Sequence, residues 1–300
     1  MRITVIHSDS AGYEPLTREQ ILKPLEAAGY EPAYVSSHAK DLSARLRDPG
    51  EMIVVAGGDG TVGKIVKRYA TVDVPVAIIP AGTANNVARA LGVCGRPDEL
   101  IAKWPTWRRR QVSLGCAAGR WGTEAFLESF GVGLMAQVIE NIEPHHDAAG
   151  FESRTHEVHH ALREMRELLR TRTPHPCEIE LDGIDYSGDY LLIEAMNLCV
   201  IGPNLWLAPM VDTGDDLLDV VLLPASQTEE FDAYLARRLE KDHAPPVLPI
   251  VRAKEVTIDP QGCAVHIDDE LHSPSYEPLD PPGPIELRVK PKAVTFLVPG

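Results

Sequence analysis

The sequence lacks any long apolar run. No stretch approaches the roughly 20 consecutive apolar residues that a membrane-spanning helix needs. The N-terminal residues M-R-I-T-V-I-H have a strand pattern and lack the apolar core and cleavage site of a secretory signal. The five cysteines are scattered along the chain and form no C-x-x-C pair and no metal-type spacing. We therefore expect a cytoplasmic protein whose cysteines are reduced, buried thiols.

An excess of positive charge is also lacking. The chain has 29 Lys and Arg against 44 Asp and Glu, a net charge of −15. Nucleic-acid binding needs a basic surface that neutralises phosphates, so we expect no nucleic-acid partner. The same charge disfavours strong general attraction to anionic lipid. The sequence leaves the oligomeric state open, including a homodimer.

The order of predicted strands and helices changes near residue 106. Before it, apolar strands alternate with helical segments, which predicts βαβ units and a parallel sheet covered on both faces. After it, many short strands separated by turns predict an antiparallel β-sandwich with inserted helices. We therefore predict a Rossmann-like α/β nucleotide-binding domain at 1–106 and a β-sandwich domain at 107–290. The C-terminal segment 291–300 is expected to return to the first domain.

The predicted strands follow from apolar and alternating runs. In the first domain they are Ile3–His7, Glu31–Ser36, Met52–Ala56 and Val74–Pro80. In the second they are Gln111–Ala117, Glu124–Phe130, Cys177–Leu181, Tyr190–Val200, Leu218–Leu223, Lys254–Ile258, Ala264–Ile267 and Ile285–Val289. Capping-box spacing at Thr17–Gln20 predicts a helix start, and an apolar stripe predicts a helix at Thr155–Thr171.

The stretch Met52–Thr61, M-I-V-V-A-G-G-D-G-T, joins a buried strand to a turn with few side chains. Gly57, Gly58 and Gly60 leave one carboxylate, Asp59, in this turn, and a helical segment follows. A strand, a glycine turn and a helix N-terminus together present backbone N–H groups to phosphate oxygens. A tight connection without a ligand would also favour glycine, so the pattern alone is a weak signal.

A second turn of the same kind lies in I-I-P-A-G-T-A-N-N-V-A-R-A-L-G at Ile78–Gly92. Gly82 would let the backbone approach a phosphate, Thr83 offers a hydroxyl group and Asn85 an amide. Helix capping by Thr83 or Asn85 would explain these residues without a ligand. Two such turns at the carboxyl ends of adjacent parallel strands favour a ligand site, because open α/β sheets bind their ligands there.

These motifs together resemble the diacylglycerol kinase catalytic family, the bacterial lipid kinases related to sphingosine and ceramide kinases. Three later stretches are similar to family motifs in the same order: F-G-V-G-L-M-A at Phe130–Ala136, L-A-P-M-V-D-T-G-D-D-L-L-D-V at Leu207–Val220 and I-D-D-E at Ile267–Glu270. The resemblance implies a nucleotide-binding domain followed by a β-sandwich. It also implies that the enzyme uses ATP and Mg²⁺ to phosphorylate a hydroxyl of diacylglycerol or a related lipid, which it meets peripherally at a membrane surface.

The resemblance also implies the site residues. ATP would be bound by Gly57, Gly58, Asp59, Gly60, Thr61, Gly82, Thr83 and Asn85, with a further contact from Ser36 or Ser37. Asp59 would act on the phosphates directly or through Mg²⁺. Asp268 would accept the proton of the lipid hydroxyl with support from Glu270, and alternation along a strand would place both carboxylates on one face. Asp215 falls where bacterial members hold a structural Mg²⁺, although an exposed acidic turn would explain it equally well.

The chain departs from the family pattern at three places. The opening N-P-x-S-G is here H-S-D-S-A at His7–Ala11, and Asp269 and Asp216 replace two glycines. Aspartate tolerates left-handed backbone angles better than most residues, so we expect both turns to survive. Two alternatives remain. An NAD kinase-like enzyme shares G-G-D-G-T but pairs it with an N-E motif, where this chain has T-A-N-N at Thr83–Asn86. A non-catalytic nucleotide-binding regulatory protein of the same fold is the other.

Overall fold

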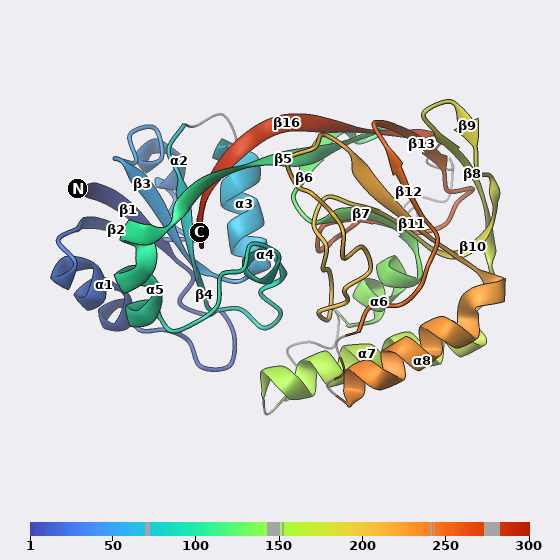
Figure 1. The fold of residues 1–300 in the computed structure, drawn as a ribbon, viewed down its shortest axis with the longest axis horizontal. Helices are drawn as coiled ribbons and strands as arrows, with labels where there is room; N and C mark the ends of the chain where they lie inside the picture. The colour runs from blue at the N-terminus through green and yellow to red at the C-terminus, as the bar shows by residue number, and fades with distance from the viewer. Residues whose placement is uncertain (70–72, 143–150, 152, 241, 243, 273–282) are drawn as a thin grey trace. The chain divides into compact units, whose positions relative to one another are not determined.

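The computed structural model describes residues 1–69, 73–142, 151, 153–240, 242, 244–272 and 283–300. The chain divides into two compact units (Figure 1). Unit 1 is Met1–Val112 with Lys292–Gly300, and unit 2 is Ser113–Pro291. Two long strands, β5 (Arg108–Gly119) and β16 (Ile285–Val298), contribute residues to both units. An α/β unit and a mainly β unit confirm the predicted fold class.

Unit 1 is built on a parallel sheet. Its strands are β1 (Arg2–His7), β2 (Glu31–Ser36), β3 (Met52–Gly57) and β4 (Val76–Pro80). They lie in the order β4-β3-β1-β2, and every neighbouring pair is parallel. The end of β16 adds a fifth parallel strand through the pair Phe296 and Val76. β1 lies between β2 and β3, so the connection from β1 to β2 runs to one side of the sheet and the connection from β2 to β3 runs back to the other side. This reversal of strand order is a topological switch point.

Short helices cover both faces of this sheet. They are α1 (Arg18–Ala27), α2 (Leu42–Arg45), α3 (Asp59–Tyr69), α4 (Asn86–Ala90), α5 (Pro97–Lys103) and the 3₁₀ turn η1 (Trp104–Thr106). In Figure 1, α1 and α5 lie on one side of the sheet and α3 on the other. Ile21 and Ile101 pack there against Val54. The predicted capping box opens α1, since Thr17 Oγ1 accepts from Gln20 N at 3.2 Å and Gln20 Oε1 accepts from Thr17 N at 2.7 Å.

Unit 2 contains two β layers around one apolar core. One layer holds β7 (Ser129–Gly133), β10 (Gly188–Met196), β11 (Leu218–Pro224), β12 (Ile250–Ala253), β14 (Val265–Ile267) and β15 (Glu270–His272). The other holds β5, β6 (Gly122–Phe126), β8 (His175–Leu181), β9 (Ile184–Asp185), β13 (Glu255–Asp259) and β16. Phe130 and Ile193 from the first layer and Ile258 from the second lie in the same core.

Three helices cover the outer face of the first layer. They are α6 (Leu134–Ile142), α7 (Arg154–Thr171) and α8 (Thr228–Leu239), with the 3₁₀ turn η3 (Ala225–Gln227) before α8. Leu162 and Leu169 of the predicted stripe on α7 are buried in one cluster with Leu223 of β11. Among the described residues, no helix combines the length and apolar character needed to cross a membrane.

Several expectations differ from the structure. The predicted strand Glu124–Phe130 is two strands, β6 and β7, and the strand predicted at Ile285–Val289 continues to Val298. The stretch Phe130–Ala136, which is similar to a family motif, is strand up to Gly133 and helix from Leu134 onward. The cysteines are unpaired, but Cys94 is exposed, so the expectation of five buried thiols is wrong. Burial of Cys177 raises the pKa of its thiol to about 12.

Candidate functional site

The two predicted glycine turns touch each other at the carboxyl ends of β3 and β4. A Cβ atom added to Gly82 would lie 2.4 Å from the Cα of Gly58, a distance that real structures do not tolerate. Ala81 N donates to Gly57 O at 3.0 Å, which continues the ladder into the turns. Glycine is therefore required at position 82, because two backbones meet there, and a Cβ atom on Gly58 would make a tight contact of 3.0 Å with Gly82 Cα. The two glycines have no side chains at this contact, so their backbone is open to a phosphate group.

Asn85 closes the second turn. Its side chain accepts from Gly82 N at 2.8 Å and donates to Gly82 O at 2.7 Å. Its φ of 53° lies in the left-handed region, which asparagine tolerates better than most residues. The side chain makes no capping hydrogen bond to α4. Asn85 thus shapes the turn, and the alternative that it caps the helix does not hold.

Asp59 joins the two turns. It starts α3, and its Oδ1 accepts from Val87 N at 2.9 Å, in the first turn of α4. One carboxylate oxygen therefore satisfies a helix N-terminus that would otherwise lack an acceptor. The predicted contact of Asp59 with phosphate would have to come in addition to this bond. Thr61 and Thr83 are half-buried nearby in the chain, and Gly60 is exposed.

Ser37 follows β2 at the same edge of the sheet. Ser37 is buried, its N–H donates to His7 O at 2.8 Å, and its carbonyl oxygen accepts from Lys64 Nζ at 3.1 Å. Ser36 Oγ instead accepts from His38 N at 3.3 Å. Lys64 on α3 was not predicted. It places a positive charge beside the strand ends, and nothing in its sequence context distinguishes it from an ordinary surface lysine.

His7 occupies the place of the asparagine in the family pattern. Its side chain is buried, and its Nδ1 lies 2.9 Å from the hydroxyl of Tyr34. Nε2 is buried and has no hydrogen-bond partner among the described residues. Burial lowers the pKa of His7, which favours the neutral imidazole. The substitution therefore places a buried imidazole beside Tyr34 of β2.

Asp268 lies in a two-residue turn of unit 2, between β14 and β15. Its Oδ1 accepts from Leu127 N at 3.0 Å and from Glu128 N at 2.7 Å. These bonds hold the carboxylate against the connection between β6 and β7. The left-handed φ of 52° falls on Asp268 itself, so the expectation that Asp269 takes the glycine conformation is wrong.

The chain reverses at this turn, because Ile267 pairs with Glu270. The expectation that Asp268 and Glu270 share one face of an extended segment is therefore wrong. Glu270 belongs to a different group, with Glu124 and His272, whose ligand-type atoms all lie within 4.8 Å of one another. His272 Nε2 is 3.4 Å from Glu124 Oε2.

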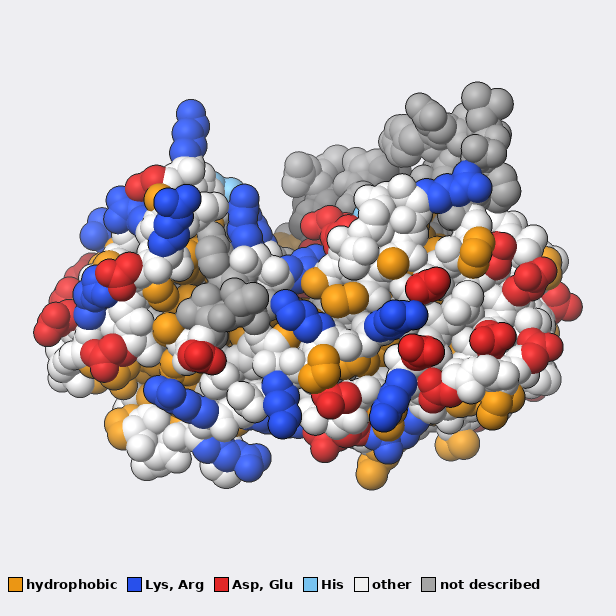
Figure 2. Space-filling view, turned by 90° about the horizontal axis from the view of Figure 1, so that it is seen from above, with side chains coloured by type: hydrophobic (Ala, Val, Ile, Leu, Met, Phe, Trp, Pro, Cys, Tyr) orange, Lys and Arg blue, Asp and Glu red, His pale blue; other side chains and the backbone are white. Residues whose placement is uncertain are grey.

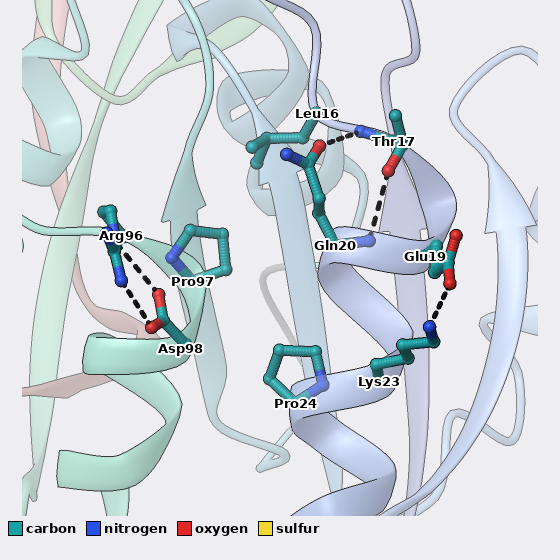
Figure 3. A pocket seen from close by; sticks show the side chains of 9 residues that line it. All are labelled: Leu16, Thr17, Glu19, Gln20, Lys23, Pro24, Arg96, Pro97 and Asp98. Atoms are coloured by element: carbon teal, nitrogen blue, oxygen red, sulfur yellow. Dashed lines mark hydrogen bonds and ion pairs between the residues drawn. The ribbon is translucent and has the colours of Figure 1, made fainter.

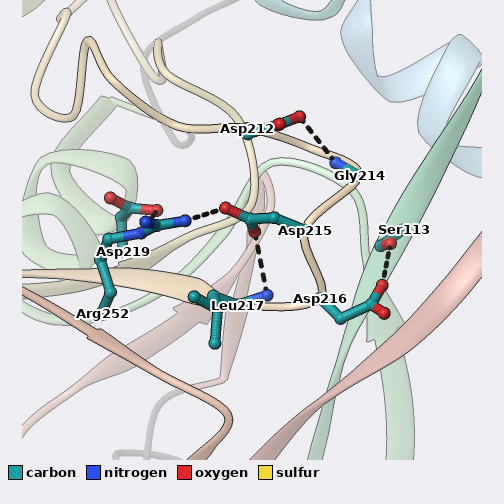
Figure 4. Close-up of polar contacts among 8 residues, drawn as sticks. All are labelled: Ser113, Asp212, Gly214, Asp215, Asp216, Leu217, Asp219 and Arg252. Carbon is teal, nitrogen blue, oxygen red and sulfur yellow. Dashed lines mark hydrogen bonds and ion pairs between the residues drawn. The ribbon is translucent and has the colours of Figure 1, made fainter.

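Asp215 lies in the aspartate loop, Asp212–Leu217, which precedes β11 (Figure 4). Its Oδ1 accepts from Leu217 N at 3.1 Å, and its Oδ2 forms an ion pair with Arg252. Asp216 has a φ of 60°, so the expectation that it replaces a left-handed glycine is confirmed. Ser113 Oγ donates to Asp216 Oδ1 at 3.1 Å. Asp215 is therefore half-buried in an ion pair, and is not simply part of an exposed acidic turn.

Two family models match the two parts of the chain. A model described as the diacylglycerol kinase catalytic domain matches residues 3–117. A model described as the YegS C-terminal NAD kinase beta sandwich-like domain matches residues 138–298, more than half of the chain. The chain belongs to the diacylglycerol kinase family. It is a kinase, and the alternative of a non-catalytic protein is set aside.

The relatives of this kinase have low sequence identity to it but match most of its chain. A diacylglycerol kinase from Bacillus subtilis is 26% identical over 251 residues, 81% of this chain and 80% of that protein. A diacylglycerol kinase from Mycobacterium tuberculosis is 26% identical over 280 residues, 86% of this chain and 80% of that protein. A crystal structure of a diacylglycerol kinase from Bacillus anthracis str. Sterne gives a TM-score of 0.71 at 22% identity, covering 99% of this chain and 96% of that one. That likeness shows a shared fold.

A pocket of about 590 Å³ lies between α1 and α5 of unit 1, away from the predicted site residues (Figure 3). It is lined by Leu16, Thr17, Glu19, Gln20, Lys23, Pro24, Arg96, Pro97 and Asp98. Its charged groups bond to one another, as in the ion pair of Arg96 with Asp98 at 2.7 Å. On the face shown in Figure 2, basic and acidic side chains are interspersed among the described residues. Neither feature adds a residue to the predicted nucleotide site of this kinase.

Proposed function

We propose that this kinase transfers the γ-phosphoryl group of ATP to a hydroxyl of diacylglycerol or a related lipid. The observation that carries the nucleotide part is the contact of Gly58 with Gly82, where a Cβ atom on Gly82 does not fit. Helices α3 and α4 both begin close after this contact in the chain. The lipid acceptor is supported by relatives named diacylglycerol kinase. The enzyme would meet its lipid at a membrane surface from the cytoplasm.

The chemistry asks mainly for positioning and charge neutralisation. Backbone N–H groups after β3 and β4 would hold the phosphates, with Thr61 and Thr83 adding hydroxyl groups. Mg²⁺ bound with the nucleotide would offset the charge that builds up on the phosphates. Asp268 would orient the acceptor hydroxyl and take its proton. Its two backbone donors at Leu127 and Glu128 fix the carboxylate for that role.

The decisive experiment compares Asp268→Asn with Asp269→Asn in the full chain. Asparagine tolerates the left-handed angle at Asp268, so the turn is kept while the base is lost. Labelled ATP and Mg²⁺ are incubated with mixed micelles of diacylglycerol, monoacylglycerol, ceramide or sphingosine, and separately with NAD. We expect lipid phosphorylation by the parent, a loss of about 10²–10⁴-fold in kcat for Asp268→Asn, and little change for Asp269→Asn.

Calorimetric titration with ATP serves as the control for binding. Both variants should bind ATP as the parent does, because neither substitution touches the two glycine turns. Phosphate transfer to NAD and to no lipid would replace the proposed acceptor. Equal rates for Asp268→Asn and the parent would remove Asp268 from the mechanism.

A further inference from the structure

A positively charged side chain of the protein lies beside the aspartate loop. Arg252, on β12, pairs through Nη2 with Oδ2 of Asp215. The other oxygen of Asp215 accepts from Leu217 N at 3.1 Å. Both carboxylate oxygens therefore have a partner within the protein, and the charged partner is a guanidinium group (Figure 4). This is the carboxylate at which the resemblance implied a structural Mg²⁺.

The position of Arg252 follows from strand register. β11 and β12 pair antiparallel, and Asp219 stands directly opposite Arg252. Side chains at such cross-strand positions are neighbours, with Cβ atoms about 4.5–5.5 Å apart. Arg252 Nε lies 3.8 Å from Asp219 Oδ2, while its Nη2 reaches the loop that precedes β11. One side chain thus spans two carboxylates, in an arrangement that the pairing of the strands fixes.

The burial of Asp219 gives a reason for a positive charge beside the aspartate loop. Its side chain is only 4% exposed, and its Oδ2 has no hydrogen-bond partner among the described residues. Burial raises the pKa of Asp219 to about 6, the expected direction for a carboxyl removed from water. A buried carboxylate is strongly destabilising unless an opposite charge lies beside it. Arg252 Nε, 3.8 Å from Oδ2, is a positively charged group at that distance.

The neighbouring aspartates are engaged elsewhere. Asp212 Oδ1 accepts from Gly214 N at 3.1 Å, and Asp216 Oδ1 accepts from Ser113 Oγ at 3.1 Å. A divalent cation at Asp215 would lie against the guanidinium of Arg252, where like charges repel. The residues present therefore do not fit a structural Mg²⁺ at Asp215.

We propose that Arg252 takes the place of a structural divalent cation. Its guanidinium group neutralises Asp215 and Asp219 together and fastens the aspartate loop to β12. The loop is then independent of metal, and the divalent cation that the kinase needs is the one that accompanies its nucleotide. This inference does not depend on which hydroxyl accepts the phosphate.

The test is thermal unfolding of the nucleotide-free full chain in chelator and in millimolar Mg²⁺, at matched ionic strength. The parent should give the same Tm in both. Arg252→Ser removes the charge and leaves room for a hydrated ion. In chelator it should melt about 2–4 °C lower than the parent, and Mg²⁺ should restore most of that loss. Arg252→Lys keeps the charge and should remain insensitive to Mg²⁺.

The matched control is Arg166→Ser, which removes the ion pair of Arg166 with Asp232, 2.7 Å long, between α7 and α8. It should lose stability without regaining it in Mg²⁺. Adding Asp215→Asn to Arg252→Ser should abolish the gain from Mg²⁺.

Two results would overturn the proposal. One is a saturable Mg²⁺ stabilisation of the parent that Asp215→Asn removes, and the other is an Arg252→Ser variant that Mg²⁺ does not stabilise. Should Arg252→Ser fail to fold, calorimetric titration of the parent with Mg²⁺ decides. An absence of binding heat would support the proposal. Binding heat that Asp215→Asn removes would refute it.

Discussion

His266 and Glu194 form a buried pair in the core of unit 2, with Nε2 and Oε1 2.9 Å apart and side chains 2% and 0% exposed. His266 Nδ1 lies 2.8 Å from the carbonyl oxygen of Asp268. A carbonyl only accepts, so Nδ1 carries a proton, and a second proton is shared between Nε2 and Glu194. Gly131 leaves room for the pair, because a Cβ there would lie 2.1 Å from His266 Nε2. The pair thus supports the turn that carries Asp268.

Breaking this pair should be costly. Glu194→Leu leaves the imidazole buried without its counter-charge and is expected to lower the free energy of unfolding by about 3–5 kcal/mol. Glu194→Gln keeps a hydrogen-bond partner and should cost less, about 1 kcal/mol. Urea unfolding measures both. Replacing both residues with leucine should cost less than the sum of the two single changes, whereas additive costs would show that the two side chains do not interact.

The same pair predicts a pH dependence. Burial alone lowers the pKa of His266, but the charge and hydrogen bond of Glu194, with a smaller effect of Asp268, outweigh it, and the pKa is raised above 6.5. A raised pKa contributes stability that is fully present below 6.5 and is lost as the pH rises through the folded-state value. The stability difference between the parent and His266→Gln should therefore shrink from mildly acidic to alkaline buffer. Urea unfolding at several pH values measures it, and a constant difference would contradict the pairing.

Buried side-chain pairs of this kind could not be predicted from the sequence. Periodicity and caps placed the strands of unit 1 and the start of α1, because those signals are local. The partner of His266 depends on three strands meeting in register, and neither residue has a distinctive neighbour along the chain. The same holds for Arg252, whose role depends on the pairing of β11 with β12. Strand register and side-chain contacts of this kind are not local properties.

The elements that were missed have a similar cause. Helix α6 begins at Leu134 directly after the buried strand β7, with Gly133 at a φ of 94° and no Ser, Thr, Asp or Asn as a cap. The predicted strand ended correctly at Ile267, but the placement of Asp268 and Glu270 on one face assumed that the chain stays extended beyond it. D-D carries none of the glycine or asparagine that usually marks a tight turn. The local signals at both places were those of a strand, and tertiary pairing decided otherwise.

Gly82→Ala should separate the two glycine turns. The new Cβ would lie 2.4 Å from Gly58 Cα, so backbone must shift. We expect a loss of about 1–3 kcal/mol in stability, as for other overpacked sites, and at least a tenfold rise in the Kd for ATP measured by calorimetry. Gly92→Ala is the control. Its Cβ would have nothing within 4 Å, so only backbone strain is added and ATP affinity should stay the same. Unchanged ATP binding by Gly82→Ala would argue against a phosphate cradle at this contact.

Asp59 offers a way to separate a structural role from a role toward phosphate. Asp59→Asn keeps an oxygen that can accept from Val87 N, where the carboxylate now accepts at 2.9 Å, so α4 should stay in place. Asp59→Ala removes the acceptor and should cost about 1 kcal/mol, as for a lost helix cap. If Asp59 also acts on the phosphates or their Mg²⁺, both variants should lose phosphoryl transfer to a similar extent, although only Asp59→Ala loses stability. Urea unfolding and steady-state kinetics on the same preparations decide the matter. Full activity of Asp59→Asn would leave Asp59 with the helix-capping role alone.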